Sequence, residues 1–189
     1  RFLKVSAFLI FPLLLGLSAV AKPFVLLLLK EQWMFAGTLL QIICFAMMWY
    51  PIHAINLNLL QVKGRSDLFL RLEIIKKVIA VVVLCVTIPM GLVPMCVGQI
   101  FTSFLSLVIN TYYTGKLIRI GFLRQMRDLL PSLLLSLSMW AIVYAVTTVF
   151  SDSWMQLLIG ASVGVVYYIG ISCLFKFPEI NELKIIFIK

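Results

Sequence analysis

The chain has 189 residues, of which 63% are apolar and only 12% are charged, and its net charge is +9. A soluble domain of this length is nearer half apolar and a quarter charged, so this chain has too little polar surface to cover a water-exposed fold. The composition excludes the soluble classes and predicts an integral membrane protein, or a large piece of one. The basic residues lie in clusters between hydrophobic runs, which favours membrane orientation over nucleic-acid binding as their role.

Six hydrophobic spans are predicted, and each is long enough as a helix to cross a hydrocarbon core of about 30 Å. In chain order they cover residues 5–29, 34–60, 68–90, 95–113, 132–150 and 154–175. Only helices are expected, because a backbone that meets lipid must satisfy its own hydrogen bonds. The predicted fold class is therefore an all-α, polytopic membrane helix bundle. Because the first residue is Arg1 and not Met, we expect the chain to begin inside a longer protein.

The third and fourth spans are predicted to form a hairpin. Residues 78–109 carry no charge, and as one helix they would be far longer than a membrane is thick. Pro89, Gly91 and Pro94 lie where the chain must turn, because proline removes a backbone donor and clashes with the preceding turn. The third helix must then begin upstream of its uncharged part, and Ser66 is a suitable N-cap.

The first part of the third helix is predicted to be amphipathic, unlike a helix that only faces lipid. Its apolar face consists of Leu68, Leu72, Ile75 and Ile79. The remaining surface carries two i,i+4 pairs of opposite charge, Asp67 with Arg71 and Glu73 with Lys77. If this surface lines a cavity, water should reach these charges from the cytoplasm.

The basic residues predict the orientation of the bundle. Fourteen of the sixteen lie before the first span, at the junction of spans two and three, between spans four and five, or after span six, where Arg71, Lys76 and Lys77 in the first part of span three are counted with that junction. The other three junctions hold only Lys22 and Lys30. Cytoplasmic loops carry an excess of Lys and Arg, so both ends of the chain are predicted to be cytoplasmic. A cleavable signal peptide is the alternative for the first span, because Arg1 and Lys4 precede an apolar run that contains Ala19-Val20-Ala21.

Two charged segments, residues 115–130 and the tail of residues 176–189, are predicted to lie on the inner membrane surface. The apolar residues that recur at helical spacing in the first segment are Ile118, Phe122, Met126 and Leu129. Basic residues lie mostly opposite them, as in a helix at a membrane interface, and the tail has a weaker form of this pattern. A solvated basic linker that follows the positive-inside rule is an equally good interpretation of both segments.

The sequence contains no catalytic constellation. It has one histidine, no pair of carboxylates in an apolar span, no Walker A motif and no G-x-G-x-x-G. The four cysteines lie inside apolar runs without C-x-x-C spacing, which argues against zinc, disulfide or thiol-redox chemistry. These are Cys44, Cys85, Cys96 and Cys173. We therefore expect no enzyme activity, no cofactor and no metal.

Polar residues in the predicted spans are the candidate site. The densest set runs from span two into span three and consists of Gln41, His53, Asn56, Asn58, Gln61, Arg65 and Asp67. Such a stripe usually faces the bundle interior or a watery cavity, although hydrogen bonding between helices is the plainer alternative. Lys22 is the only cation well inside a span, unless its side chain reaches the outer interface. Asn110 in span four is a further candidate.

Several strings resemble the C-terminal half of bacterial polysaccharide exporters. They are residues 11–21 (FPLLLGLSAVA) with Trp33, residues 50–52 (YPI), residues 55–58 (INLN), residues 64–70 (GRSDLFL) and residues 73–77 (EIIKK). The family is that of Wzx-type flippases, which belong to the multidrug/oligosaccharidyl-lipid/polysaccharide exporter superfamily. The resemblance covers most of the chain and is strongest between Trp33 and Lys77.

The resemblance implies a fold, a location and a substrate. The six spans would be the last six of fourteen helices arranged in two lobes, in a bacterial cytoplasmic membrane. The lobes would rock around a central cavity in an alternating-access cycle. The substrate would be a polyprenyl-pyrophosphate-linked oligosaccharide, and membrane lipids and other polysaccharide-assembly proteins would be the further partners. No nucleic acid is expected.

Residue roles follow from the chemistry of that substrate. Phosphate oxygens require Arg or Lys, and sugars require amides and hydroxyls in a wet cavity. We expect the cations Arg65, Lys76 and Lys77 at the inner mouth of the cavity, with Asn56, Asn58 and His53 deeper. Among them Arg65 is the best single candidate, because its planar fork can hold phosphate oxygens in pairs.

Two other functions stay open from the sequence. An ion-coupled exporter of small amphipathic cations, from the same superfamily, would require a membrane-embedded carboxylate, and none of the seven acids lies in the middle of a span. A membrane enzyme of polysaccharide assembly would require catalytic loops on the outer face, where the predicted loops have only a few residues.

Overall fold

The structure is a computed structural model that describes residues 2–118, 121–180 and 182. The regular elements in that part of the chain are all helices, which confirms the predicted all-α class. The α-helices are α1 (Phe2–Ala19), α2 (Ala21–Leu29), α3 (Met34–Met47), α4 (Tyr50–Val62), α5 (Ser66–Thr87), α6 (Leu92–Ile118), α7 (Phe122–Val149) and α8 (Ser153–Leu174). Two short 3-10 helices, η1 (Glu31–Trp33) and η2 (Ile88–Met90), precede α3 and α6.

Five stretches of the described chain are helical, long and apolar enough to cross a membrane. They are Phe2–Ala19, Glu31–Val62, Leu92–Gly115, Phe122–Val149 and Ser153–Leu174. Helix α5 is not among them, because Arg71, Glu73, Lys76 and Lys77 interrupt its apolar sequence. The third predicted span, residues 68–90, therefore carries more charge than the other five and is not a candidate membrane span by itself.

Two predicted spans are interrupted by helix breaks. Residues 5–29 divide at Val20 into α1 and α2, and residues 34–60 divide between α3 and α4. Each break lies just before a proline, Pro23 in α2 and Pro51 in α4. A proline ring supplies no N–H and clashes with the carbonyl group four residues earlier, which stops the preceding helix at that point. The break between α3 and α4 frees backbone carbonyl groups inside the bundle.

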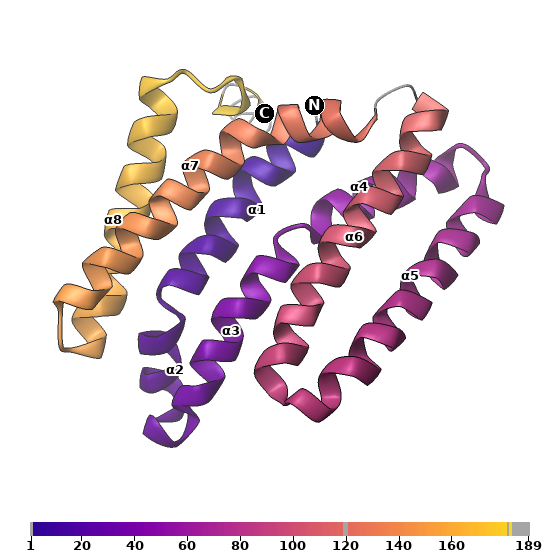
Figure 1. The fold of residues 1–189 in the computed structure, drawn as a ribbon. Coiled ribbons are helices and arrows are strands. Elements are labelled where there is room, and N and C mark those ends of the chain that lie inside the picture. Colours follow the sequence, from indigo (N-terminus) through magenta and orange to yellow (C-terminus); the bar gives the residue numbers. More distant parts are fainter. Residues whose placement is uncertain (1, 119–120, 181, 183–189) are drawn as a thin grey trace.

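The helices run between two opposite ends of the bundle (Figure 1). The start of α1, the α4–α5 junction, the α6–α7 junction and the end of α8 lie at one end. The junctions after α2, α5 and α7 lie at the other. At the first of these ends, Lys4 of α1 and Asp128 of α7 form an ion pair at 3.0 Å. Helix α1 therefore begins at the end of the bundle where α8 ends.

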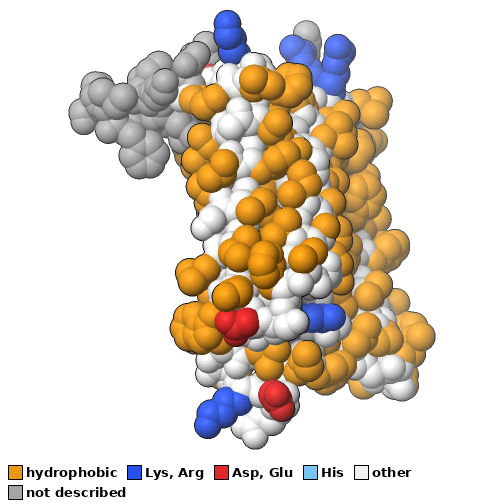
Figure 2. Space-filling view, turned by 90° about the vertical axis from the view of Figure 1, so that its left-hand side faces the viewer, with side chains coloured by type: hydrophobic (Ala, Val, Ile, Leu, Met, Phe, Trp, Pro, Cys, Tyr) orange, Lys and Arg blue, Asp and Glu red, His pale blue; other side chains and the backbone are white. Residues whose placement is uncertain are grey.

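Helix α1 packs against α7, α8, α3 and α4 and forms the centre of the bundle. One apolar cluster joins α1 to the α3–α4 break and to α6 and α7, and it includes Phe11, Trp49 and Leu129. A second cluster joins α1 to α7 and α8 around Met139 and Tyr168. The outer face of α8 is apolar and exposed, and Figure 2 shows hydrophobic side chains over the middle of this side of the molecule, with charged ones toward the two ends.

Residues 122–130 do not form a separate surface helix. They are the first turns of α7, which runs without interruption through Pro131 and has 28 residues. The predicted apolar face is present, but it points into the bundle: Leu129 is buried, and Phe122 and Met126 pack against the first cluster. At about 1.5 Å per residue, α7 is about 42 Å long, so its charged first turns reach beyond a hydrocarbon core of about 30 Å.

The structure describes only part of the other residues that were predicted to lie on the membrane surface. Residues 115–118 form the end of α6, and residues 119 and 120 lie outside the described part of the chain. Of the predicted surface tail, residues 178–180 are helical, and residues 181 and 183–189 also lie outside the described part.

Helices α5 and α6 form the predicted hairpin, which turns at Gly91 with a φ of 103°. Near this turn the two helices are close, because a Cβ added to Gly98 of α6 would lie 2.9 Å from Cγ1 of Val83. Of the residues in α5, all of which the structure describes, Leu72 alone is buried. Helix α5 is therefore held closely at one end and lies at the border of the bundle along the rest of its length.

The ion pairs of α5 differ from the two predicted i,i+4 pairs. Asp67 accepts from Arg65, which precedes the helix, and Glu73 accepts from Lys76 at i,i+3. The helix begins at Ser66 itself, with Arg65 at the N-cap position and no side-chain cap. The charged residues of α5 thus form two groups. Asp67 pairs with Arg65 at the start of the helix, and Glu73 pairs with Lys76 two turns further along.

Candidate functional site

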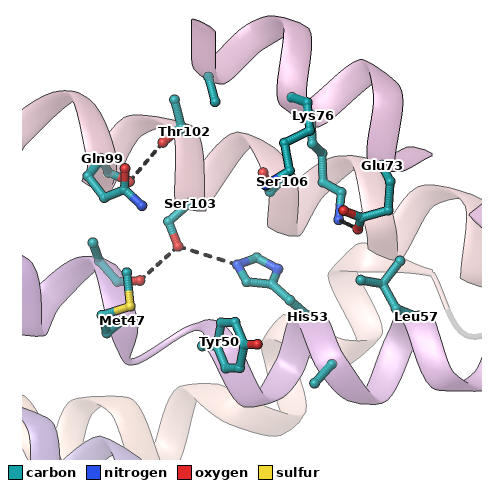
Figure 3. Close-up of a pocket in the computed structure, with 14 residues that line it drawn as sticks. Met47, Tyr50, His53, Leu57, Glu73, Lys76, Gln99, Thr102, Ser103 and Ser106 are labelled. Atoms are coloured by element: carbon teal, nitrogen blue, oxygen red, sulfur yellow. Dashed lines mark hydrogen bonds and ion pairs between the residues drawn. The ribbon is translucent and has the colours of Figure 1, made fainter. Parts of the chain in front are cut away.

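A polar cavity lies between α5 and the rest of the bundle, next to the α3–α4 break (Figure 3). Its volume is about 360 Å³. The residues that line it come from four helices and are Ala46, Met47, Tyr50, His53, Ala54, Leu57, Glu73, Lys76, Lys77, Ala80, Gln99, Thr102, Ser103 and Ser106. Three of the residues predicted from the sequence are brought together here, namely His53, Lys76 and Lys77.

One wall of the cavity is formed by neutral polar residues of α6: Gln99, Thr102, Ser103 and Ser106. Together with Asn110 behind them, they recur at i, i+3, i+4, i+7 and i+11, which places them on one face of a helix. The sequence interpretation singled out only Asn110. The helical spacing of polar residues in an otherwise apolar span was the signal that would have found the others.

His53 projects from α4 into the cavity and is fixed by hydrogen bonds on both ring nitrogens. The Ser103 hydroxyl donates to the backbone oxygen of Ala46 at 2.8 Å, so its oxygen is free to accept from Nε2 of His53 at 3.3 Å. Nδ1 is then the unprotonated nitrogen, and Nδ2 of Asn110 lies 3.5 Å from it. This network assigns a neutral ring with the hydrogen on Nε2. The Ala46 carbonyl group is available because the helix ends just after it.

Asn110 is fully buried behind His53, and its side chain makes fewer hydrogen bonds than it could. Its Oδ1 has no hydrogen-bond partner among the described residues. A buried acceptor without a partner costs about 1–3 kcal/mol, so this amide is held in place at the expense of stability. The hydrogen bond between Nδ2 of Asn110 and Nδ1 of His53 is the only one that its side chain makes with the described residues.

The opposite wall of the cavity is charged and belongs to α5. Lys76 donates to Oε1 of Glu73, and their side chains are 12% and 31% exposed. Lys77 also lines the cavity and has no acidic partner among the described residues. With two lysines, one glutamate and a neutral His53, the lining has a net charge of +1. The cavity therefore offers cations on one side and hydroxyl and amide groups on the other.

Asn56 lies behind the cavity and joins two helices. Its Nδ2 donates to Oε1 of Gln125 in α7 at 3.1 Å, and Nε2 of Gln125 donates back to Oδ1 of Asn56 at 3.2 Å. Both residues are buried. The structure thus gives Asn56 the role of a hydrogen bond between helices, which was the plainer of the two sequence interpretations.

Five other predicted residues do not line the cavity. Asn58 and Gln61 are exposed on α4, and Lys22 is half-buried in the first turn of α2. Arg65 and Asp67 are exposed and form an ion pair at 3.1 Å. The hydrogen bond from Arg65 lowers the pKa of the Asp67 carboxyl group, and Asp67 in turn raises the pKa of Arg65. Arg65 is paired with Asp67 outside the cavity, whereas Lys76, which is paired with Glu73, and the exposed Lys77 both line it.

The lining of the cavity offers several kinds of binding group. The described residues contain no cluster of three or more His, Cys, Asp or Glu side chains that would hold a metal ion. Cations and neutral hydrogen-bonding groups facing one another are the chemistry with which proteins bind anionic, hydroxyl-rich molecules.

Comparison with known proteins gives one relative. The chain is 31% identical over 121 residues to a protein of Klebsiella pneumoniae named "Uncharacterized membrane protein in cps region". The match covers 61% of this chain and 24% of the relative, so the chain spans about a quarter of the length of the relative that it matches. No family model matches the sequence. No solved structure matches it either. The chain is thus a multi-pass helical membrane protein that is similar to part of a membrane protein from a cps region.

Proposed function

We propose that the chain is part of a transporter that moves lipid-linked oligosaccharide repeat units across the cytoplasmic membrane by alternating access. The observation that carries the proposal is the two-sided cavity, in which lysines of α5 face hydroxyl and amide groups of α6. A polyprenyl-pyrophosphate-linked sugar has the matching parts, an anionic pyrophosphate and a hydroxyl-rich glycan. The relative's cps region, a capsule-polysaccharide region, supports the same class of substrate.

The position of the cavity also supports transport. It lies beside a helix that is broken at Pro51, and broken helices commonly surround the substrate sites of transporters. Helix α5 borders the cavity with a single buried residue, Leu72, so it can move more easily than the helices at the centre. Lys76 and Lys77 would bind the pyrophosphate, and the α6 wall would bind the first sugar.

A cation exporter of the same superfamily is the second candidate, and one observation favours it. Glu73 is a carboxylate in the wall of the cavity, which is the group that such an exporter requires. However, Glu73 is paired with Lys76, and the net charge of the lining is positive, which disfavours a cationic substrate.

Deletion of the gene, followed by complementation, tests the proposal. Without the protein, surface glycan should fall, and lipid-linked repeat units should accumulate in the inner leaflet. Lys76→Gln should fail to restore export, because one of the two cations facing the cavity is lost. Arg65→Gln is the matched control: it removes the same charge outside the cavity and should restore most of the export. An unchanged surface glycan after deletion would refute the proposed function, and loss of resistance to cationic compounds instead would favour the second candidate.

A further inference from the structure

Lys76, the most enclosed cation of the cavity, already has an anionic partner. Its ammonium group donates to Oε1 of Glu73, and only 12% of its side chain is exposed. An ion pair in such a setting is less screened by water and salt than a pair on the surface. Any anion that enters the cavity must therefore compete with a carboxylate that is present from the start.

The Glu73–Lys76 pair has no evident role in holding the fold together. Both residues lie on α5, one turn apart, so their contact joins no second helix. The contacts that fix α5 are elsewhere, at Leu72 and in the close approach of Val83 to Gly98. Glu73 is also the only acid in the lining of the cavity. Its position is better explained by what enters the cavity than by packing.

We propose that Glu73 is an internal competitor that occupies Lys76 while the cavity is empty and makes the site select multiply charged anions over singly charged ones. This inference rests on the proposed function, because it concerns the same cavity. A monoanion that displaces Glu73 replaces one ion pair with another and gains little. A pyrophosphate group carries several charged oxygens and can bind Lys76 and Lys77 together, so it gains a contact that Glu73 alone does not make. Selection of this kind penalises the wrong ligand rather than improving the right one.

Binding of two probes to the purified protein, in nanodiscs of uncharged lipid, tests the inference. The probes are inorganic pyrophosphate and the singly charged sugar acid glucuronate. Glu73→Gln keeps the shape of the side chain and removes the competing charge. It should strengthen glucuronate binding by up to about tenfold, which is the equivalent of one lost charge-assisted hydrogen bond, and should strengthen pyrophosphate binding less. Asp67→Asn is the matched control, because it removes the same charge from the same helix outside the cavity, and it should leave both affinities unchanged.

A double-mutant cycle with Lys76→Gln separates competition from a general charge effect. If Glu73 acts by occupying Lys76, the gain from Glu73→Gln should disappear in the Lys76→Gln background. A gain that persists there, or an equal gain from Asp67→Asn, would overturn the inference, since any lost negative charge would then suffice. If wild-type protein binds pyrophosphate through Lys76 but Glu73→Gln changes nothing, the competitor role alone fails. If neither wild-type nor Glu73→Gln binds pyrophosphate, the proposed function fails with it.

Discussion

The two sides of the bundle are built on different principles. On one side, α1, α7 and α8 meet through small and apolar residues, and a Cβ added to Gly160 would lie 3.0 Å from side-chain atoms of both Thr147 and Val20. On the other side, α5 buries only Leu72 and presents charged residues to a cavity of about 360 Å³. The first side meets through apolar contacts, which also border an apolar groove of about 840 Å³ between α1, α7 and α8, and the second side borders a smaller polar cavity.

This difference has a physical origin in the membrane. Lipid tails are as apolar as the helices, so helices associate by close packing, for which small residues are needed. The sequence Gly160-x-x-x-Gly164 supplies that surface on α8. Helix α5 has no comparable surface along the cavity, and its lysines require water or counter-charges. The comparison therefore teaches that apolar packing holds one side of the bundle together, whereas the other side keeps polar and charged groups around a cavity.

The comparison predicts the largest loss of stability on the packed side. Gly160→Leu should destabilise the folded protein by about 3 kcal/mol, because the new side chain has no space beside Thr147 and Val20. Gly170→Leu is the control on the same helix, since no atom lies within 4 Å of a Cβ added there. Reversible unfolding in SDS measures both variants. Equal stability of the two would show that α8 is not closely packed against its neighbours.

A smaller loss is expected where α5 meets the bundle. Leu72→Ala should cost about 2 kcal/mol, because it removes the one buried side chain of this helix. Leu70→Ala, at a side chain that is 59% exposed, should have little effect. The same unfolding assay applies, and a cysteine in the cavity wall should become easier to label in Leu72→Ala. If Leu70→Ala cost as much as Leu72→Ala, α5 would have to face the bundle with a different side.

The buried amide pair between α4 and α7 should have a still smaller effect. Asn56→Leu removes two hydrogen bonds to Gln125 and should cost about 1 kcal/mol, in the range measured for polar contacts between membrane helices. Asn58→Leu, at an exposed position two residues further on, is the control. Because Asn56 does not line the cavity, Asn56→Leu should leave the affinity for pyrophosphate unchanged, and a fall in that affinity would place Asn56 in the substrate path.

The smallest effect is expected for the exposed Arg65–Asp67 pair. The hydrogen bond from Arg65 lowers the pKa of Asp67 below its ordinary value of 3.8. The pair therefore stabilises the folded protein above pH 3.8, and this contribution is lost as the pH falls through the lowered pKa. Asp67→Asn should slightly lower stability at neutral pH, where exposed pairs contribute little, and should match wild type once Asp67 is protonated. A large effect at neutral pH would mean that this pair is enclosed in the protein, as Glu73 and Lys76 are.

Part of the candidate site could be predicted from the sequence. His53 stood out because lipid penalises a polar group inside a span, and Lys76 and Lys77 stood out as cations that suit the phosphate of the substrate that the resemblance implies. Arg65 stood out for the same chemistry, but its neighbour Asp67 pairs with it, and the structure places it outside the lining. Ser103 and Ser106 did not stand out, because a hydroxyl group in an apolar helix usually bonds within its own helix.

The sequence by itself determined the all-α membrane class of the protein and the segments that carry the basic residues. These properties depend on hydropathy and charge summed along a single stretch of chain, and no second stretch is needed to read them. Only the tertiary structure decided which polar faces meet. His53 and Ser103 are 50 residues apart, and they come together because α4 packs against α6 in the folded bundle. That contact depends on where two helices cross, and hydropathy contains no information about crossing.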